Sequence, residues 1–176
     1  MALSSEIVLE KIKAKFGEAV SENTESLDLL TVNIDRSQAH ELVKFLKEEE
    51  TLRFNFLTTL CGFHYPNNDV ESQFAVAYHM HNWVDNFRIR IKTYLNGVNP
   101  EVDSMTDLFL SSNWQERETY DFYGIEFKNH PDLKRILNMD EMVSFPMRKE
   151  FPLEDANRTD KDDRYFGRLP QNTNLN

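Results

Sequence analysis

Charged side chains crowd one short stretch of the sequence, residues 116–135. Carboxylates and imidazoles are ordinary metal ligands, so the stretch offers four candidate ligands: Glu116, Glu118, Asp121 and His130. If the stretch is helical, Glu118 and Asp121 share a face, but Glu116 lies well around the helix from Glu118. A set divided in this way is poorly arranged to hold one metal ion.

Arginines are interleaved with these carboxylates. Arg117 lies between Glu116 and Glu118, and Arg135 follows Lys134. A guanidinium beside a carboxylate usually forms an ion pair or a bidentate hydrogen bond. The stretch therefore predicts a rigid, ion-paired surface that contacts another protein.

A second candidate metal site lies at His79 and His81, which are two positions apart and so share one face of a strand. The sequence near them offers no third ligand, and we interpret them as core or interface histidines. A stand-alone metallohydrolase built from these histidines and the acidic residues near Glu118 is a competing hypothesis.

The composition excludes several other kinds of site. The single cysteine, Cys61, cannot supply the thiolates of an iron–sulfur cluster or a structural zinc site, and its apolar neighbours predict a buried side chain. The five glycines are scattered, which excludes phosphate-binding loops. A net charge of -10 without a Lys/Arg cluster argues against nucleic acid. Neither a signal peptide nor a bilayer-spanning apolar run is evident.

Hydrophobic periodicity predicts the elements that position these groups. One segment, residues 87–95, alternates cleanly, with apolar side chains and Thr93 on one face and Arg88, Arg90 and Lys92 on the other. This pattern indicates a half-exposed strand of an antiparallel sheet, and short connections favour a meander. We expect further strands at residues 27–34, 54–65 and 74–79. We expect helices at residues 4–16 (stopped by Gly17), after a cap at Asp35 or Ser37, at 103–109, and at 114–123 (ended by Gly124).

The last quarter of the chain has a different character. Four of the six prolines fall there, and a short helix is expected only at residues 133–137. Residues 146–152 are expected to be extended, because residues before proline avoid the helical region. Arg148 and Lys149 between two prolines suit a rigid segment that docks on the body or on a partner. The fold class is therefore α/β of the α+β type: a mixed, largely antiparallel sheet packed with helices (residues 1–130), followed by an extended C-terminal tail (residues 131–176).

Two motifs in this region resemble a known family. The first is Glu116-Arg117-Glu118, Asp121-Phe122-Tyr123-Gly124-Ile125 and His130-Pro131-Asp132-Leu133-Lys134-Arg135-Ile136-Leu137, which resembles the signature of the C-type subunit of proton-translocating NADH:quinone oxidoreductase, respiratory complex I. The second, Pro146-Met147-Arg148-Lys149-Glu150-Phe151-Pro152, is similar to the family's Pro-Leu-Arg-Lys-Asp-Tyr/Phe-Pro motif. Met147, Glu150 and His64 depart from the family's usual leucine, aspartate and aspartate.

The resemblance implies a subunit of the hydrophilic arm without catalytic, cofactor-binding or metal residues of its own. FMN, iron–sulfur clusters and quinone would belong to partner subunits. The expected neighbours are the D-, B- and I-type subunits of complex I, and the expected location is peripheral, on the cytoplasmic face of the bacterial inner membrane. The equivalent subunit of a membrane-bound hydrogenase or a ferredoxin-linked complex is an alternative. The residues that the resemblance marks as signature or interface are Glu116, Arg117, Glu118, Asp121, Gly124, His130, Pro131, Arg135, Pro146, Arg148, Lys149 and Pro152.

Overall fold

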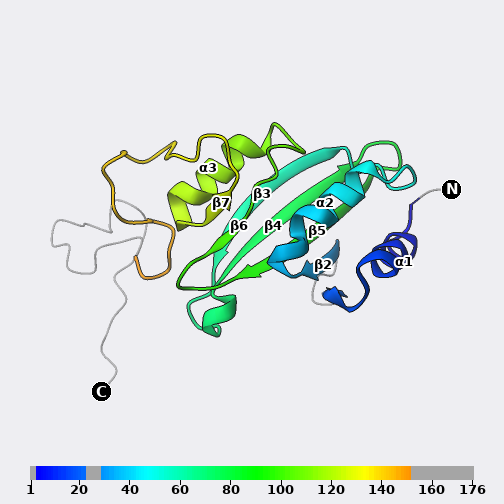
Figure 1. Ribbon diagram of the computed structural model, residues 1–176, viewed down its shortest axis with the longest axis horizontal. Coiled ribbons are helices and arrows are strands. Elements are labelled where there is room, and N and C mark those ends of the chain that lie inside the picture. Colours follow the sequence, from blue (N-terminus) through cyan, green and yellow to red (C-terminus); the bar gives the residue numbers. More distant parts are fainter. Residues whose placement is uncertain (1–2, 23–28, 152–176) are drawn as a thin grey trace, which may run out of the picture.

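A computed structural model of the chain describes residues 3–22 and 29–151 (Figure 1). Its main sheet has five strands in the order β1-β2-β5-β4-β3, and a separate pair is formed by β6 and β7. The strands are β1 (Val20–Glu22), β2 (Leu30–Ile34), β3 (Phe56–His64), β4 (Phe74–Asn82), β5 (Phe87–Leu95), β6 (Glu101–Asp103) and β7 (Glu126–Lys128).

Three α-helices accompany the sheet, and short 3₁₀ turns occupy Gly17–Ala19, Arg36–Gln38 and Val70–Ser72. Helix α1 (Ser5–Phe16) begins at Ser4, whose hydroxyl accepts a hydrogen bond from the Ile7 amide, and it ends at Gly17 as predicted. Helix α2 (Ala39–Glu48) follows the cap at Asp35 and lies across the sheet in Figure 1. Helix α3 (Ser112–Tyr123) ends at Gly124.

The sheet confirms the predicted mixed, largely antiparallel class. Strands β3, β4 and β5 form the expected antiparallel meander, while β2 pairs with β5 in parallel. A parallel neighbour requires the long connection through α2, β3 and β4, which the strand pattern alone does not reveal. In β5, Ile89, Ile91 and Thr93 are buried and Arg88 is exposed, which confirms the predicted alternation.

One apolar cluster joins the helices to the buried face of the sheet. Val8 and Ile12 of α1 and the Leu42–Leu46 stripe of α2 pack with side chains from β2 to β5. Tyr78, at the centre of β4, is the largest of the fully buried side chains. The body is therefore stabilised mainly by the removal of apolar surface from water, as in most folds.

Three predicted elements are wrong. Residues 103–109 form the end of β6 and a single turn instead of a helix, because the Glu116 carboxylate binds the Ser104 hydroxyl and the Met105 amide. Residues 133–137 wrap around Asp121 and form no helix. Residues 146–151 form successive turns and are not extended, since the restriction before proline applies only to the residue that directly precedes it.

Cys61 is half-buried and not buried as predicted, because its side chain lies on the face of the sheet opposite the apolar cluster. Residues 27–28 of the predicted first strand lie outside the described residues, as does the segment from Pro152 onward. Within the described residues, no helix combines the length and hydropathy needed to cross a bilayer.

Candidate subunit contact site

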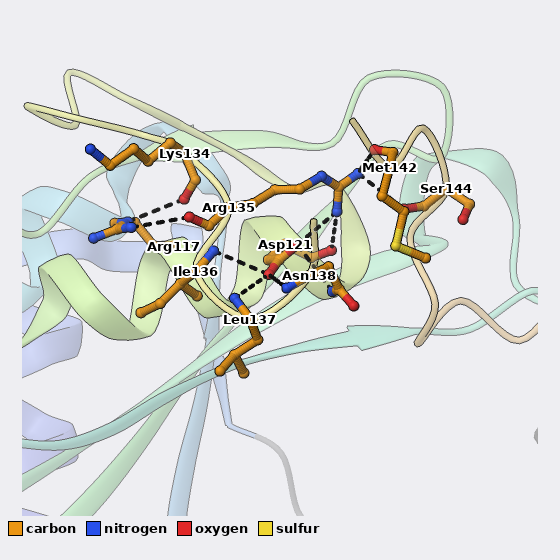
Figure 2. Close-up of polar contacts among 9 residues, drawn as sticks. All are labelled: Arg117, Asp121, Lys134, Arg135, Ile136, Leu137, Asn138, Met142 and Ser144. Carbon is orange, nitrogen blue, oxygen red and sulfur yellow. Dashed lines mark hydrogen bonds and ion pairs between the residues drawn. The ribbon is translucent and has the colours of Figure 1, made fainter. Parts of the chain in front are cut away.

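The centre of the site is the carboxylate of Asp121, which is fully buried near the end of α3 (Figure 2). Its Oδ2 accepts hydrogen bonds from three successive backbone amides, those of Ile136 (3.2 Å), Leu137 (2.8 Å) and Asn138 (2.9 Å). Its Oδ1 accepts from Arg135 Nη1 at 2.7 Å and from the Asn138 side chain at 3.1 Å. The chain after the helix is thus folded around one negative charge.

The electrostatics follow from these bonds. Burial alone would raise the pKa of Asp121, but the amides of Asn138 and Leu137 and the Arg135 guanidinium outweigh it and hold this pKa well below its usual range. The Arg135 side chain is 8% exposed and that of Asp121 is 0% exposed, so the ion pair is almost completely removed from water. A buried pair of this kind fixes geometry, and loss of either partner is costly.

Arg135 also connects more distant parts of the segment. Its Nη2 donates to the carbonyls of Met142 and Ser144, and its guanidinium carbon lies 4.9 Å from the centre of the Phe145 ring. Arg117, one turn before Asp121 on α3, donates to the carbonyls of Lys134 (3.1 Å) and Arg135 (3.1 Å). Figure 2 shows Arg117 and Asp121 of α3 meeting Arg135 and the carbonyl groups of the loop that follows.

Gly124 and Arg148 make a second attachment. Gly124 has a φ of 71°, which favours glycine, and a Cβ there would lie 2.6 Å from Phe145 and 2.7 Å from Arg148 Nη2. Arg148 Nε donates to the Tyr123 carbonyl at 2.8 Å, and its guanidinium lies over the rings of Phe74 and Phe145. The segment therefore lies directly against the helix end and the sheet.

Histidines support both ends of this contact. His130 Nδ1 accepts from the Asp132 amide, so its Nε2 carries the proton and donates to the Asn113 carbonyl at 3.2 Å. His64 Nδ1 accepts from the Lys149 amide at 3.0 Å, and burial lowers the pKa of His64. Imidazole acceptors thus hold the turn at Pro131 and the turns after Pro146.

Two of the predicted site residues lie elsewhere on α3. Glu116 is buried on the opposite side of the helix, where it accepts from Ser104 Oγ (2.6 Å) and the Met105 amide (2.7 Å). Burial raises the pKa of Glu116 from 4.5 to about 7, although these hydrogen bonds act in the other direction. Glu118 is exposed. The predicted separation of Glu116 from Glu118 is confirmed, as is the ion-pair interpretation for Asp121 and Arg135.

In the part of the chain that the structure describes, no three His, Cys, Asp or Glu side chains form a group suited to a metal ion. The predicted candidate ligands therefore do not form a metal site there. His79 Nε2 accepts from Arg90 Nε at 2.8 Å, and His81 Nε2 lies 3.0 Å from the Asn86 side-chain oxygen. A metal at these histidines would have to replace both contacts.

Sequence reasoning missed Asn138, which binds Asp121, and Ser104, which binds Glu116. Phe145, an aromatic residue of the segment expected to dock on the body or on a partner, lies against Arg135 and Arg148, as arginines often stack on rings. The sequence carries no signal for Asn138, because its role depends on where the loop brings its amide. We call residues 130–151, as held by Asp121, Arg135 and Arg148, the docked segment.

Comparison with known proteins identifies the family to which the sequence is similar. Residues 32–157 match the family described as respiratory-chain NADH dehydrogenase, 30 Kd subunit. The chain belongs to this family.

Related proteins align with this chain over nearly the whole length of both sequences. The C-type subunit of the NADH-quinone oxidoreductase of Citrifermentans bemidjiense is 39% identical over 90% of this chain and 94% of its own. That of a Roseiflexus species is 36% identical over 97% of this chain and 98% of its own. These relatives are subunits of an oxidoreductase complex by name, so the family resemblance that the two motifs predicted is confirmed.

Solved structures show the same fold. The trypsin-resistant fragment of Nqo5 is 34% identical, with a TM-score of 0.60 over 73% of this chain and 98% of the fragment. A chain of the archaeal membrane-bound sulfane sulfur reductase has a TM-score of 0.70 over 89% of this chain and 95% of its own. The second is only 18% identical, so it shows likeness of fold alone.

Proposed function

We propose that this chain is a structural, non-redox subunit of the hydrophilic peripheral arm of an NADH:quinone oxidoreductase. It packs against the quinone-site subunits, types D and B, and contacts the I-type subunit. In this position it supports electron transfer from NADH to quinone coupled to proton translocation. The chain binds no cofactor and has no catalytic residue. FMN, the iron–sulfur clusters and quinone lie in partner subunits, and the assembly is attached through those partners to the cytoplasmic face of the bacterial inner membrane.

The observation that carries this proposal is the outer surface of the docked segment. Leu137, Met139 and Val143 are 64%, 74% and 95% exposed, although the segment beneath them is fixed by buried hydrogen bonds. Apolar side chains held outward on a rigid support are typical of protein interfaces. The arrangement needs no reacting group, and the ligand-capable atoms of Asp121 and His130 are already engaged inside the chain.

The test is purification of the tagged full-length chain from its native membrane in a mild detergent. We expect the D-, B- and I-type subunits to co-purify, together with NADH:quinone reductase activity. A flavin-binding subunit in the same complex distinguishes NADH input from the related hydrogenase and ferredoxin-linked complexes. The chain expressed alone should contain neither flavin nor iron in stoichiometric amount, and finding either would contradict the non-redox role.

A matched pair of variants tests the surface itself. Leu137→Asp with Val143→Asp places two charges on the docked segment, whereas Val98→Asp places one at a turn residue outside it that is 85% exposed. All three side chains are exposed, so folding of the isolated chain should be unaffected. We expect only the first variant to lose the D-type subunit from the purified complex. Equal retention of this partner by both variants would contradict the assignment of this surface.

A further inference from the structure

Strands β2 to β5 present basic but no acidic side chains on the second face of the main sheet. The chain has 30 Asp and Glu in 176 residues, yet none occurs in β2, β3, β4 or β5. The lysine and arginine residues on these strands, with His79 and His81, lie on the side opposite the apolar cluster. We call this side the cationic face, defined by His79, His81, Arg88, Arg90 and Lys92 with the aromatic residues Phe63, Tyr65 and Tyr94.

The register brings these groups together. His79 lies opposite Arg90, His81 opposite Arg88, and Lys92 lies further along the same strand. Alternate residues of a strand are about 7 Å apart, so the three β5 cations form a straight, evenly spaced row.

Two cations of this row, Arg90 and Lys92, are held in place by neighbouring side chains. Lys92 Nζ is 2.9 Å from the Tyr94 hydroxyl and 3.1 Å from that of Tyr65, and it lies over both rings. Burial would lower the pKa of Lys92, but these hydroxyls raise it above the usual value. Arg90 Nε donates to His79, which must be neutral to accept, and burial and the charge of Arg90 lower the pKa of His79 accordingly.

Within residues 3–22 and 29–151, no carboxylate lies within ion-pair distance of this row. Lys11, Lys128 and Arg135 each pair with an acidic side chain, but Arg88, Arg90 and Lys92 form no ion pair there. Charged groups that are fixed without a counter-charge set up a field that attracts a complementary surface.

Apolar side chains adjoin one end of the row. At the turn between β4 and β5, Trp83 is 65% exposed and Val84 is 83% exposed. The Trp83 ring lies 5.3 Å from that of Phe56 and 4.9 Å from that of His81, so it is supported on two sides. Tryptophan and arginine are the residue types that most often carry the binding energy of interfaces.

This end of the sheet is far from the docked segment. Phe56 begins β3 and His64, which binds the Lys149 amide, ends it. A strand of this length spans about 25 Å. A partner seated on Trp83 and Arg88 therefore meets a different area of the molecule from one seated on Leu137 and Val143.

We propose that the cationic face is a second docking surface, which binds an acidic protein surface of a neighbouring subunit. The inference rests on the proposed function, because it requires an assembly with more than one neighbour. Nucleic acids and anionic lipid are repelled by the net charge of -10, and a row of three cations does not overcome this repulsion. A two-fold pairing of this face with itself would oppose like charges.

The experiment uses the full chain in the complex purified from its native membrane. A photo-reactive phenylalanine analogue at Val84 should cross-link to another subunit, at a segment rich in Asp and Glu. Arg88→Glu should reduce retention of that subunit about tenfold, and more steeply as salt is raised. Lys13→Glu, on the exposed part of α1, is the matched control and should have no effect.

The outcomes separate the two proposals. If the wild-type chain brings down no NADH:quinone oxidoreductase subunits, the proposed function fails. If it brings them down and Arg88→Glu retains the same set at every salt concentration, only the cationic-face proposal fails. Cross-linking from position 84 to lipid, to nucleic acid or to a second copy of this chain would also overturn it.

Discussion

The body and the docked segment are held by different physical means. The body has one continuous apolar cluster that joins two helices to a five-stranded sheet. The docked segment has neither helix nor strand, and it is fixed by one buried carboxylate and two arginines. The body is therefore sensitive to changes of volume, and the docked segment is sensitive to changes of charge. The segment proposed to face a partner is specified by directional hydrogen bonds and ion pairs, whereas the body is specified by apolar packing.

Asp121→Ala is expected to have the largest effect, because it removes the carboxylate that holds the docked segment. The variant leaves the Arg135 guanidinium buried without its counter-charge and three backbone amides without their acceptor. We expect a loss of about 4 kcal/mol, felt as detachment of the docked segment. Hydrogen exchange of the Leu137 and Asn138 amides measures it and should accelerate about a thousandfold. Unchanged protection of these amides would contradict the role given to Asp121.

Leu46→Ala is the corresponding change in the body. Leu46 is fully buried in α2 within the apolar cluster. Truncation leaves a cavity, and we expect the free energy of unfolding to fall by about 3 kcal/mol. Denaturant unfolding of the isolated chain measures this loss. Protection of the Leu137 amide against local opening should stay as in the wild type, and a selective loss there would show that the two regions are not independent.

The two buried carboxylates of α3 give opposite dependences on pH. The pKa of Glu116 is raised from 4.5 to about 7, so its contribution to stability is fully present below about pH 4.5 and is lost as the pH rises through about 7. The pKa of Asp121 is lowered, so its contribution is present above about pH 3.8 and is lost as the pH falls. Glu116 therefore favours the folded chain most at low pH, whereas Asp121 holds the docked segment most securely at neutral pH.

Glu116→Gln isolates one of these contributions. The amide cannot ionise, so the decrease in unfolding free energy between about pH 4.5 and 7, about 2 to 3 kcal/mol in the wild type, should largely disappear. Denaturant unfolding at a series of pH values measures this slope. An identical slope in the variant and the wild type would assign the dependence to another group.

The sequence predicts those features that depend on local pattern. The alternation of β5, the end of α3 at Gly124 and the pairing of carboxylate with arginine all follow from residue type and spacing. The parallel pairing of β2 with β5 does not, because it is set by the path of the chain between them. The absent helix at residues 133–137 has a related cause. Amides that could have closed a helical turn bind Asp121 instead, and any sequence supplies such amides.

The smallest expected effect is the most selective test of the contrast between the two regions. Glu118 is exposed on the same helix as Asp121 and Glu116, so Glu118→Gln should change the stability of the isolated chain by less than about 0.5 kcal/mol. The motif that it shares with Asp121 predicts, under the proposed function, that Glu118 contacts a neighbouring subunit. The same variant should therefore lower recovery of the intact complex while thermal unfolding of the isolated chain is unchanged. If Glu118→Gln changes neither the recovery of the complex nor the thermal unfolding of the isolated chain, Glu118 is not part of the contact site. The requirement for a carboxylate in this motif would then rest on Asp121, whose hydrogen bonds lie inside the chain.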